Sequence, residues 1–185
     1  MKKSFLLFPV LILILSCTKN TDKPIDTYLS GSGVFILNEG NFRWGNGSLS
    51  FYSYDSAKIY NDLFLNINER PLGDVPNSMV IYGEMAYIVV NNSGKIEVVN
   101  KSTLLSQSTI DDLISPRNMA VVTNSKAYVT SIYSDSVAII NLNSNTISGY
   151  INIRRTSEAI VVSGSKAYIS NWVGGDEIMV SFRIE

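Results

Sequence analysis

The sequence predicts an all-β chain, an incomplete β-propeller of about three and a half four-stranded blades. The first observation is a repeat: the Ala-Tyr pairs that begin at residues 86, 127 and 167 lie 41 and 40 residues apart. A period near 40 residues is typical of one propeller blade. The second observation is that the repeats carry short runs of β-branched residues separated by turn formers, without the 3.6-residue periodicity of a helical array.

The repeat unit at residues 117–151 shows the pattern of a complete blade. Asn, Asp and Ser separate its apolar runs, and these residues favour turns because their side chains bond the local backbone. We expect strands at residues 118–122, 126–131, 136–141 and 146–151. The preceding unit, residues 76–110, predicts strands at residues 78–82, 85–90, 95–100 and 104–110.

The units at the two ends predict three strands each. We expect strands at residues 34–38, 49–52 and 58–64 in the first unit (34–64), and at residues 159–162, 166–170 and 177–184 in the last (159–184). Closed propellers have four to eight blades, so this array would leave unpaired strand edges. Two explanations stay open: the chain is a truncated piece of a longer propeller, or it completes its ring by oligomerising.

The N-terminus predicts a lipoprotein. Residues 1–16 combine a short basic start with an apolar stretch too short to span a bilayer, which is typical of a signal peptide. The sequence Ile14-Leu15-Ser16-Cys17 resembles the bacterial lipobox, whose cysteine is acylated, although a chance cysteine is the alternative. Residues 17–33 would then be the acylated Cys17 and a flexible tether. We expect an outer-membrane lipoprotein exposed at the cell surface, with the periplasmic face left open.

Charge and composition argue against nucleic-acid binding and against enzymatic activity. The formal net charge is −1, and without Lys2 and Lys3 of the signal peptide it becomes −3, so no basic face is expected. The chain has no histidine, the commonest general base and transition-metal ligand. We expect no catalytic residues, no metal and no cofactor. A calcium-dependent hydrolase using carboxylates such as Asp111 and Asp112 stays open as a less favoured alternative.

Two segments carry a resemblance to known families. Residues 127–131, 136–142 and 145–147 resemble the YVTN repeat of surface-layer propellers. Residues 33–42 and 46–52, together with the lipobox, resemble the N-terminal half of YncE-like surface lipoproteins of Bacteroidetes. That family includes cobalamin-binding partners of TonB-dependent vitamin B12 transporters. The resemblance implies a non-enzymatic module that captures a corrinoid for such a transporter, and a protein-interaction propeller without a small ligand is the alternative.

The insertion at residues 39–47 is the first candidate site. It departs from the repeat pattern and holds Asn41, Arg43 and Trp44 amid three glycines, which allow tight turns. Trp and Arg are enriched in binding hot spots. The alternative is that Trp44 folds back onto the core of its own blade.

Equivalent positions in successive repeats supply the remaining candidates. Asn77, Arg117, Asn118 and Glu158 precede or begin the first strand of a blade, so they should share one face near the ring axis. Tyr133 and Trp172 follow the second strand and would stack on a flat ligand. The alternatives are a solvated channel mouth for the polar set and packing between blades for Trp172. Tyr87, Tyr128 and Tyr168 recur at one repeat position, which predicts packing between blades.

Overall fold

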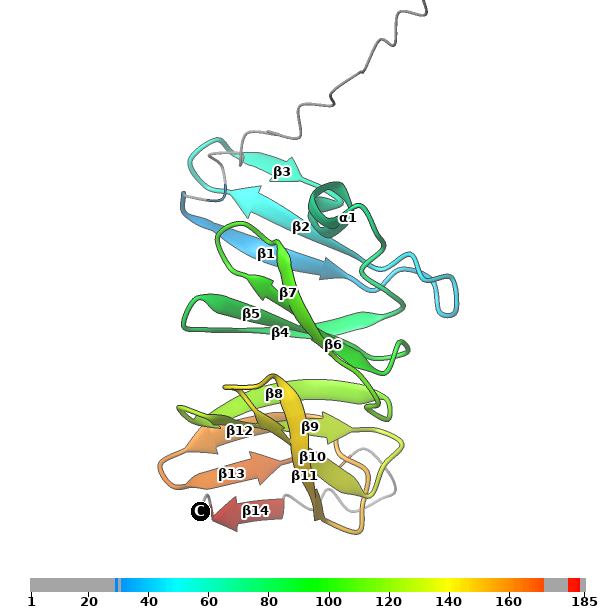
Figure 1. Cartoon of the computed structure of the whole chain (residues 1–185), viewed down its shortest axis with the longest axis vertical. Coiled ribbons are helices and arrows are strands. Elements are labelled where there is room, and N and C mark those ends of the chain that lie inside the picture. Colours follow the sequence, from blue (N-terminus) through cyan, green and yellow to red (C-terminus); the bar gives the residue numbers. More distant parts are fainter. Residues whose placement is uncertain (1–28, 30, 172–179, 184–185) are drawn as a thin grey trace, which may run out of the picture.

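The computed structural model describes Leu29, residues 31–171 and residues 180–183. Within these residues the chain forms fourteen strands and one short helix, arranged in four antiparallel sheets that follow one another along the molecule (Figure 1). The predicted signal peptide, Cys17 and Trp172 lie outside the described residues. No helix in the described part of the chain is long and apolar enough to cross a membrane.

Each sheet is one blade, and its strands pair in chain order. Blade 1 holds β1 (Gly33–Asn38), β2 (Ser48–Ser53) and β3 (Lys58–Tyr60). Blade 2 holds β4 (Pro76–Tyr82), β5 (Met85–Val90), β6 (Lys95–Asn100) and β7 (Ser106–Ile110). Blade 3 holds β8 (Pro116–Thr123), β9 (Lys126–Ser131), β10 (Ser136–Asn141) and β11 (Thr146–Asn152). Blade 4 holds β12 (Ile160–Ser163), β13 (Lys166–Ile169) and β14 (Val180–Arg183).

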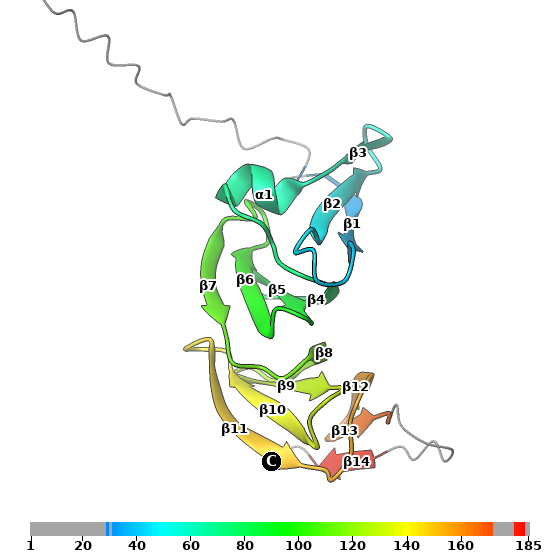
Figure 2. The same cartoon turned by 90° about the vertical axis from the view of Figure 1, so that its right-hand side faces the viewer.

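The blades are arranged as in an open propeller, which confirms the predicted fold class. The first strand of blade 3, β8, contacts the first strands of both neighbours, β4 and β12. Figure 2 shows these three strands along one side of the arc, with β7 and β11 on the other. The first strands therefore line the inner side, and each blade is built outward from them.

The core lies between blades, which explains why a strand such as β5 is apolar on both faces. On β5, Ala86, Ile88 and Val90 face the cluster shared with blade 1, whereas Tyr87 and Val89 face the cluster shared with blade 3. A third cluster joins Tyr128 of blade 3 to Ala167 and Ile169 of blade 4. A strand covered on both faces needs a continuous apolar run rather than an alternating one. The predicted packing of Tyr87 and Tyr128 between blades is confirmed.

Within the part of the chain that the structure describes, blade 1 has no counterpart of β4, the inner strand of blade 2. The last strand of blade 1, β3, corresponds to the last strand of blade 2, β7. Counted back from there, β2 corresponds to β6 and β1 to β5. Within the described residues β1 pairs with β2 alone, so its inward edge carries no strand. The sequence predicted three strands here, and those that the structure describes correspond to the outer three strands of blade 2.

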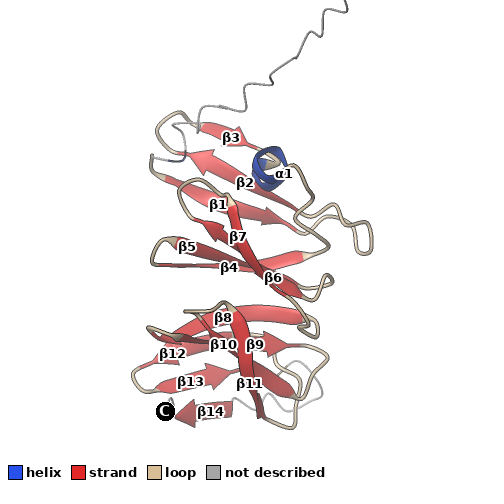
Figure 3. Ribbon diagram, viewed as in Figure 1, coloured by secondary structure: helices blue, strands red, loops and turns tan. Residues whose placement is uncertain are grey.

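The predicted strand at residues 58–64 is wrong in its second half. The strand ends at Tyr60, and residues Leu63–Asn68 form helix α1, which Figure 3 shows beside β2. Asp62 and Glu69, at the two ends of α1, both adopt the left-handed conformation with φ of 55°. Adjacent Leu63 and Phe64 are both buried in the cluster between blades 1 and 2, which an alternating strand would not allow.

Candidate ligand-binding face

One end of the blades gathers the connections that could form a binding surface. The start of each first strand pairs with the end of the second strand, as in Pro76 with Val90 and Pro116 with Ser131. The turns after the second strands and the connections between blades therefore meet at one end, on the right in Figure 1. We call this end the loop face. It comprises residues 39–47, 61–75, 91–94, 111–115, 132–135 and 153–157.

The loop at residues 39–47 presents two large aromatic side chains to solvent. Trp44 is 76% exposed and Phe42 is 61% exposed, so Trp44 does not cap the core of its blade. The Arg43 guanidinium carbon lies 5.2 Å from the centre of the Phe42 ring, within the range of a cation–π contact. Asn41 is exposed beside them. Figure 1 shows this loop extending beyond the ends of the sheets.

Hydrogen bonds fix the backbone of this loop, although its side chains are exposed. The Trp44 amide donates to the Asn41 carbonyl at 3.0 Å, and the Asn41 amide donates to Asn46 Oδ1 at 2.8 Å. The Gly47 amide donates to the Gly73 carbonyl at 3.0 Å. The loop is therefore closed on itself and tied to the segment that leads into β4.

Arg117 and Glu158, which the sequence predicted as ligand contacts, bind each other. Arg117 Nε lies 2.9 and 3.0 Å from the two Glu158 carboxylate oxygens, and Arg117 Nη2 lies 2.7 Å from Oε1. Both side chains are 23% exposed. This ion pair joins equivalent positions of blades 3 and 4, and their role as ligand contacts stays a prediction.

The asparagines of the predicted polar set also bond between blades. Asn77 Nδ2 and Ser78 Oγ donate to the Arg117 carbonyl at 2.8 and 2.7 Å. One blade further on, Asn118 Nδ2 donates to the Glu158 carbonyl at 3.0 Å. The structure thus brings the four predicted residues together as a chain of contacts along the inner strands.

Tyr133 stands apart from this chain of contacts. It lies in the turn after β9, and its side chain is 72% exposed. Its backbone amide donates to Ser131 Oγ at 3.3 Å, which fixes the turn. In the same blade a small pocket is lined by Ile114, Ser131, Ser134 and Tyr150, among others.

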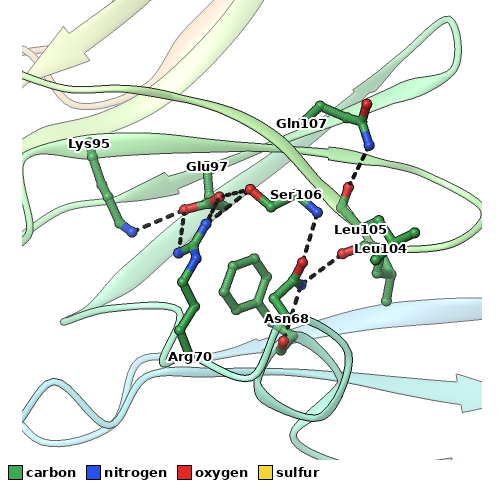
Figure 4. A network of polar contacts seen from close by, with 9 residues as sticks. Asn68, Arg70, Lys95, Glu97, Leu104, Leu105, Ser106 and Gln107 are labelled. Atoms are coloured by element: carbon green, nitrogen blue, oxygen red, sulfur yellow. Dashed lines mark hydrogen bonds and ion pairs between the residues drawn. The ribbon is translucent and has the colours of Figure 1, made fainter. Parts of the chain in front are cut away.

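A network around the buried Glu97 carboxylate secures the connection from blade 1 to blade 2 (Figure 4). The Glu97 side chain is fully buried and accepts hydrogen bonds from Arg70 Nη2 at 2.5 Å, Lys95 Nζ at 3.0 Å and Ser106 Oγ at 2.6 Å. Arg70 also stacks 4.9 Å from the centre of the Phe64 ring. This network fastens the segment after α1 to blade 2.

The charge state of Glu97 follows from this network. Burial by itself would raise the pKa of Glu97, because a desolvated carboxylate favours its neutral form. Hydrogen bonds from Arg70, Ser106 and Lys95 more than offset burial, so the pKa is lowered. Glu97 is therefore an ionised, fully partnered structural carboxylate.

Sequence reasoning missed two residues of the loop face, Phe42 and Asp74. Phe42 lies in the predicted loop but was not singled out, and its exposure could not be read from its residue type. Asp74 is 8% exposed and its Oδ2 accepts a hydrogen bond from the Arg43 amide at 2.8 Å. Nothing in the local sequence signals this contact across 31 residues.

In the described residues no group of three or more His, Cys, Asp or Glu side chains could hold a metal ion.

The fold and the loop face define a β-propeller-like protein. The chain belongs to the family described as Domain of unknown function (DUF5074), whose model matches residues 32–180. The sequence matches none of the curated proteins.

Three solved structures with the same fold share 13–15% sequence identity with this chain. Hydrazine synthase of Kuenenia stuttgartiensis has a TM-score of 0.67 at 15% identity, covering 84% of this chain and 44% of that one. A quinoprotein alcohol dehydrogenase-like protein of Bacteroides thetaiotaomicron has a TM-score of 0.67 at 13% identity, covering 84% and 37%. The RRP9 WD40 repeats have a TM-score of 0.60 at 15% identity, covering 84% and 49%. The chain thus spans less than half of each, and the likeness shows the fold alone.

Proposed function

We propose that this protein is a non-enzymatic binding module whose loop face contacts its ligand through Phe42 and Trp44. The observation that carries the proposal is the combination of exposure and order in one loop. Both aromatic side chains are mostly exposed, yet hydrogen bonds hold the backbone between them. Aromatic anchors on an ordered loop lose little conformational entropy on binding, which favours affinity.

A corrinoid is the ligand that we propose, on the strength of the resemblance to YncE-like surface lipoproteins. The chemistry of the loop is compatible with it. A corrin ring offers a flat conjugated face on which Trp44 would stack, and amide side chains that Asn41 and Arg43 would bond. A TonB-dependent outer-membrane transporter is the proposed partner that receives the corrinoid.

The proposed location is the outer membrane, with the propeller on a lipid anchor at Cys17 and exposed at the cell surface. The support is the lipobox-like sequence that ends at Cys17. Growth of an expressing Gram-negative host with an alkyne-labelled fatty acid tests this. We expect label on the wild-type chain and none on Cys17→Ser; equal labelling of both would contradict the anchor.

Calorimetric titration of the purified chain with cyanocobalamin tests the binding proposal. We expect measurable heat and a defined stoichiometry for the wild type, and at least about tenfold weaker binding for Phe42→Ala/Trp44→Ala, because hot-spot aromatics are each worth about 2 kcal/mol or more. Tyr54→Ala is the matched control, since Tyr54 is 61% exposed in the turn after β2, outside the loop face. Equal affinity in all three proteins would contradict a site at this loop.

A protein-interaction module without a small ligand is the second candidate. The observation that favours it is shape: Phe42 and Trp44 stand on a loop that extends beyond the sheets, whereas small-molecule sites are usually concave. Under this function the wild type would give no heat with cyanocobalamin, and Phe42→Ala/Trp44→Ala would release a protein partner that the wild type retains.

A further inference from the structure

Asp74 occupies an unusual position between two loops of the loop face. Its Oδ2 accepts hydrogen bonds from the Arg43 amide at 2.8 Å and from Asn92 Nδ2 at 2.5 Å. Arg43 belongs to the loop of blade 1, and Asn92 to the turn between β5 and β6 of blade 2. One carboxylate oxygen of Asp74 therefore joins the exposed loop to the neighbouring blade.

We propose that Asp74 is a positioning residue that holds the Phe42–Trp44 loop in its ligand-contacting conformation. This inference rests on the function proposed above, because it assigns the residue that orders the same contact surface. Asp74 itself is 8% exposed, so it acts through the backbone of the loop.

The loop needs such a partner at Arg43. Arg43 lies between the two aromatic residues and adopts a φ of 68°, a left-handed conformation that is unfavourable for a residue with a Cβ atom. Its amide points at a carboxylate, and hydrogen bonds to charged acceptors are stronger than neutral ones. The bond to Asp74 therefore stabilises a backbone conformation that Arg43 would otherwise leave.

Asp74 is itself fixed on the side of blade 2. Its amide donates to Ser93 Oγ at 2.9 Å, and its carbonyl accepts from the Asn92 amide at 3.1 Å. A Cβ atom on the preceding Gly73 would come within 2.7 Å of Ser93 Oγ, so the two segments lie in close contact. An acceptor held this firmly constrains the loop that bonds to it.

Only one of the two Asp74 carboxylate oxygens takes part in these contacts. Oδ2 accepts both bonds, whereas Oδ1 is buried and has no hydrogen-bond partner among the described residues. An asparagine at position 74 would keep one carbonyl oxygen in the place of Oδ2, lose the charge, and put an amide NH2 in the place of Oδ1. An alanine would remove the acceptor.

Trypsin cleavage after Arg43 measures the order of the loop without any ligand. We expect Asp74→Ala to raise the rate of this cleavage by about tenfold or more. Asp74→Asn should stay within about threefold of the wild type, because asparagine still offers an acceptor oxygen to the Arg43 amide, whereas alanine offers none. Cleavage after the exposed Arg154 and Arg155, in the connection between blades 3 and 4, is the internal control and should stay equal in all three proteins. Equal cleavage after Arg43 in wild type and Asp74→Ala, or equal acceleration in Asp74→Asn and Asp74→Ala, would overturn the proposal.

A second measurement decides the matter if Asp74→Ala does not fold. In the wild-type protein the Arg43 amide should exchange with deuterium at least about tenfold more slowly than the Phe42 amide, because a bonded amide must open before it exchanges. Fast exchange at Arg43 would overturn the proposal. Neither measurement uses a ligand, so a failed cyanocobalamin titration leaves the role of Asp74 standing, and failure of these two tests leaves the binding proposal standing.

Discussion

Arg117 and Glu158 hold the same position in successive blades, and they face each other across the blade boundary, where Arg117 Nε lies 2.9 and 3.0 Å from the two Glu158 carboxylate oxygens. Varied polar residues at one repeat position suggested a shared ligand surface, but the side chains of neighbouring copies also meet there. Residues at equivalent repeat positions lie at the same distance from the propeller axis, so their side chains can form hydrogen bonds between neighbouring blades.

The Arg117–Glu158 pair should stabilise the contact between blades 3 and 4. We expect Arg117→Ala and Glu158→Ala each to lower the free energy of unfolding by about 1 kcal/mol, because the pair is partly exposed and solvent weakens it. Urea unfolding of the two single variants and the double variant gives the coupling energy. Coupling indistinguishable from zero would mean that these side chains do not support each other.

Asn77 and Ser78 should substitute for each other, since both donate to the Arg117 carbonyl. We expect Asn77→Ala and Ser78→Ala each to cost less than about 0.5 kcal/mol, and the double variant to cost about 1–2 kcal/mol, because only the double variant strips the carbonyl of both donors. Thermal unfolding of the three variants measures this. Strictly additive losses would show that the two bonds are independent.

Glu97 should be the most sensitive carboxylate in the described chain. We expect Glu97→Gln to lower the free energy of unfolding by about 2 kcal/mol or more, because it leaves Arg70 and Lys95 beside an uncharged buried group. The matched control is Glu84→Gln, whose partner is Lys101 and whose side chain is 72% exposed, and it should cost no more than about 0.5 kcal/mol. Similar losses in the two variants would contradict the structural role of the network.

The same residue predicts a pH dependence of stability. The folded-state pKa of Glu97 is below its ordinary value of 4.5, so its contribution is present above pH 4.5 and is lost as pH falls through the folded-state pKa. The stability gap between wild type and Glu97→Gln should therefore be wide at pH 7 and shrink at pH 3. Urea unfolding at both pH values measures the gap; a gap that widens on acidification would contradict the lowered pKa.

The strands were predictable because their chemistry repeats. Residues 85–90 are apolar on both faces, and residues 126–131 hold the apolar run 127–129; strands covered on both faces show this pattern. Helix α1 was not predictable, because the burial of Leu63 and Phe64 depends on residues of blade 2 such as Leu104. Asp62 stands at the N-cap and is a residue type that favours helix starts, but it adopts a left-handed conformation and makes no side-chain cap hydrogen bond.

The sequence was enough to predict an exposed loop at the candidate site, but not the contacts that its residues make with distant parts of the chain. The glycines and the aromatic and basic residues of 39–47 marked an exposed insertion, and Trp44 is exposed. The anchor at Asp74 and the pairing of Arg117 with Glu158 join residues 31 and 41 positions apart. Contacts at such separations follow from how the blades stack, and a single sequence holds no local signal for them.

Hydrogen–deuterium exchange with and without cyanocobalamin tests the proposed function most directly, because it reports where a ligand sits. We expect slower exchange in residues 39–47 on addition of cyanocobalamin, with smaller effects in the turns at 91–94 and 132–135. The turns at the opposite end of the blades, such as residues 83–84 and 124–125, should not change. Protection confined to those opposite turns, or unchanged exchange across the loop face at saturating cyanocobalamin, would contradict the proposal that this face captures a corrinoid.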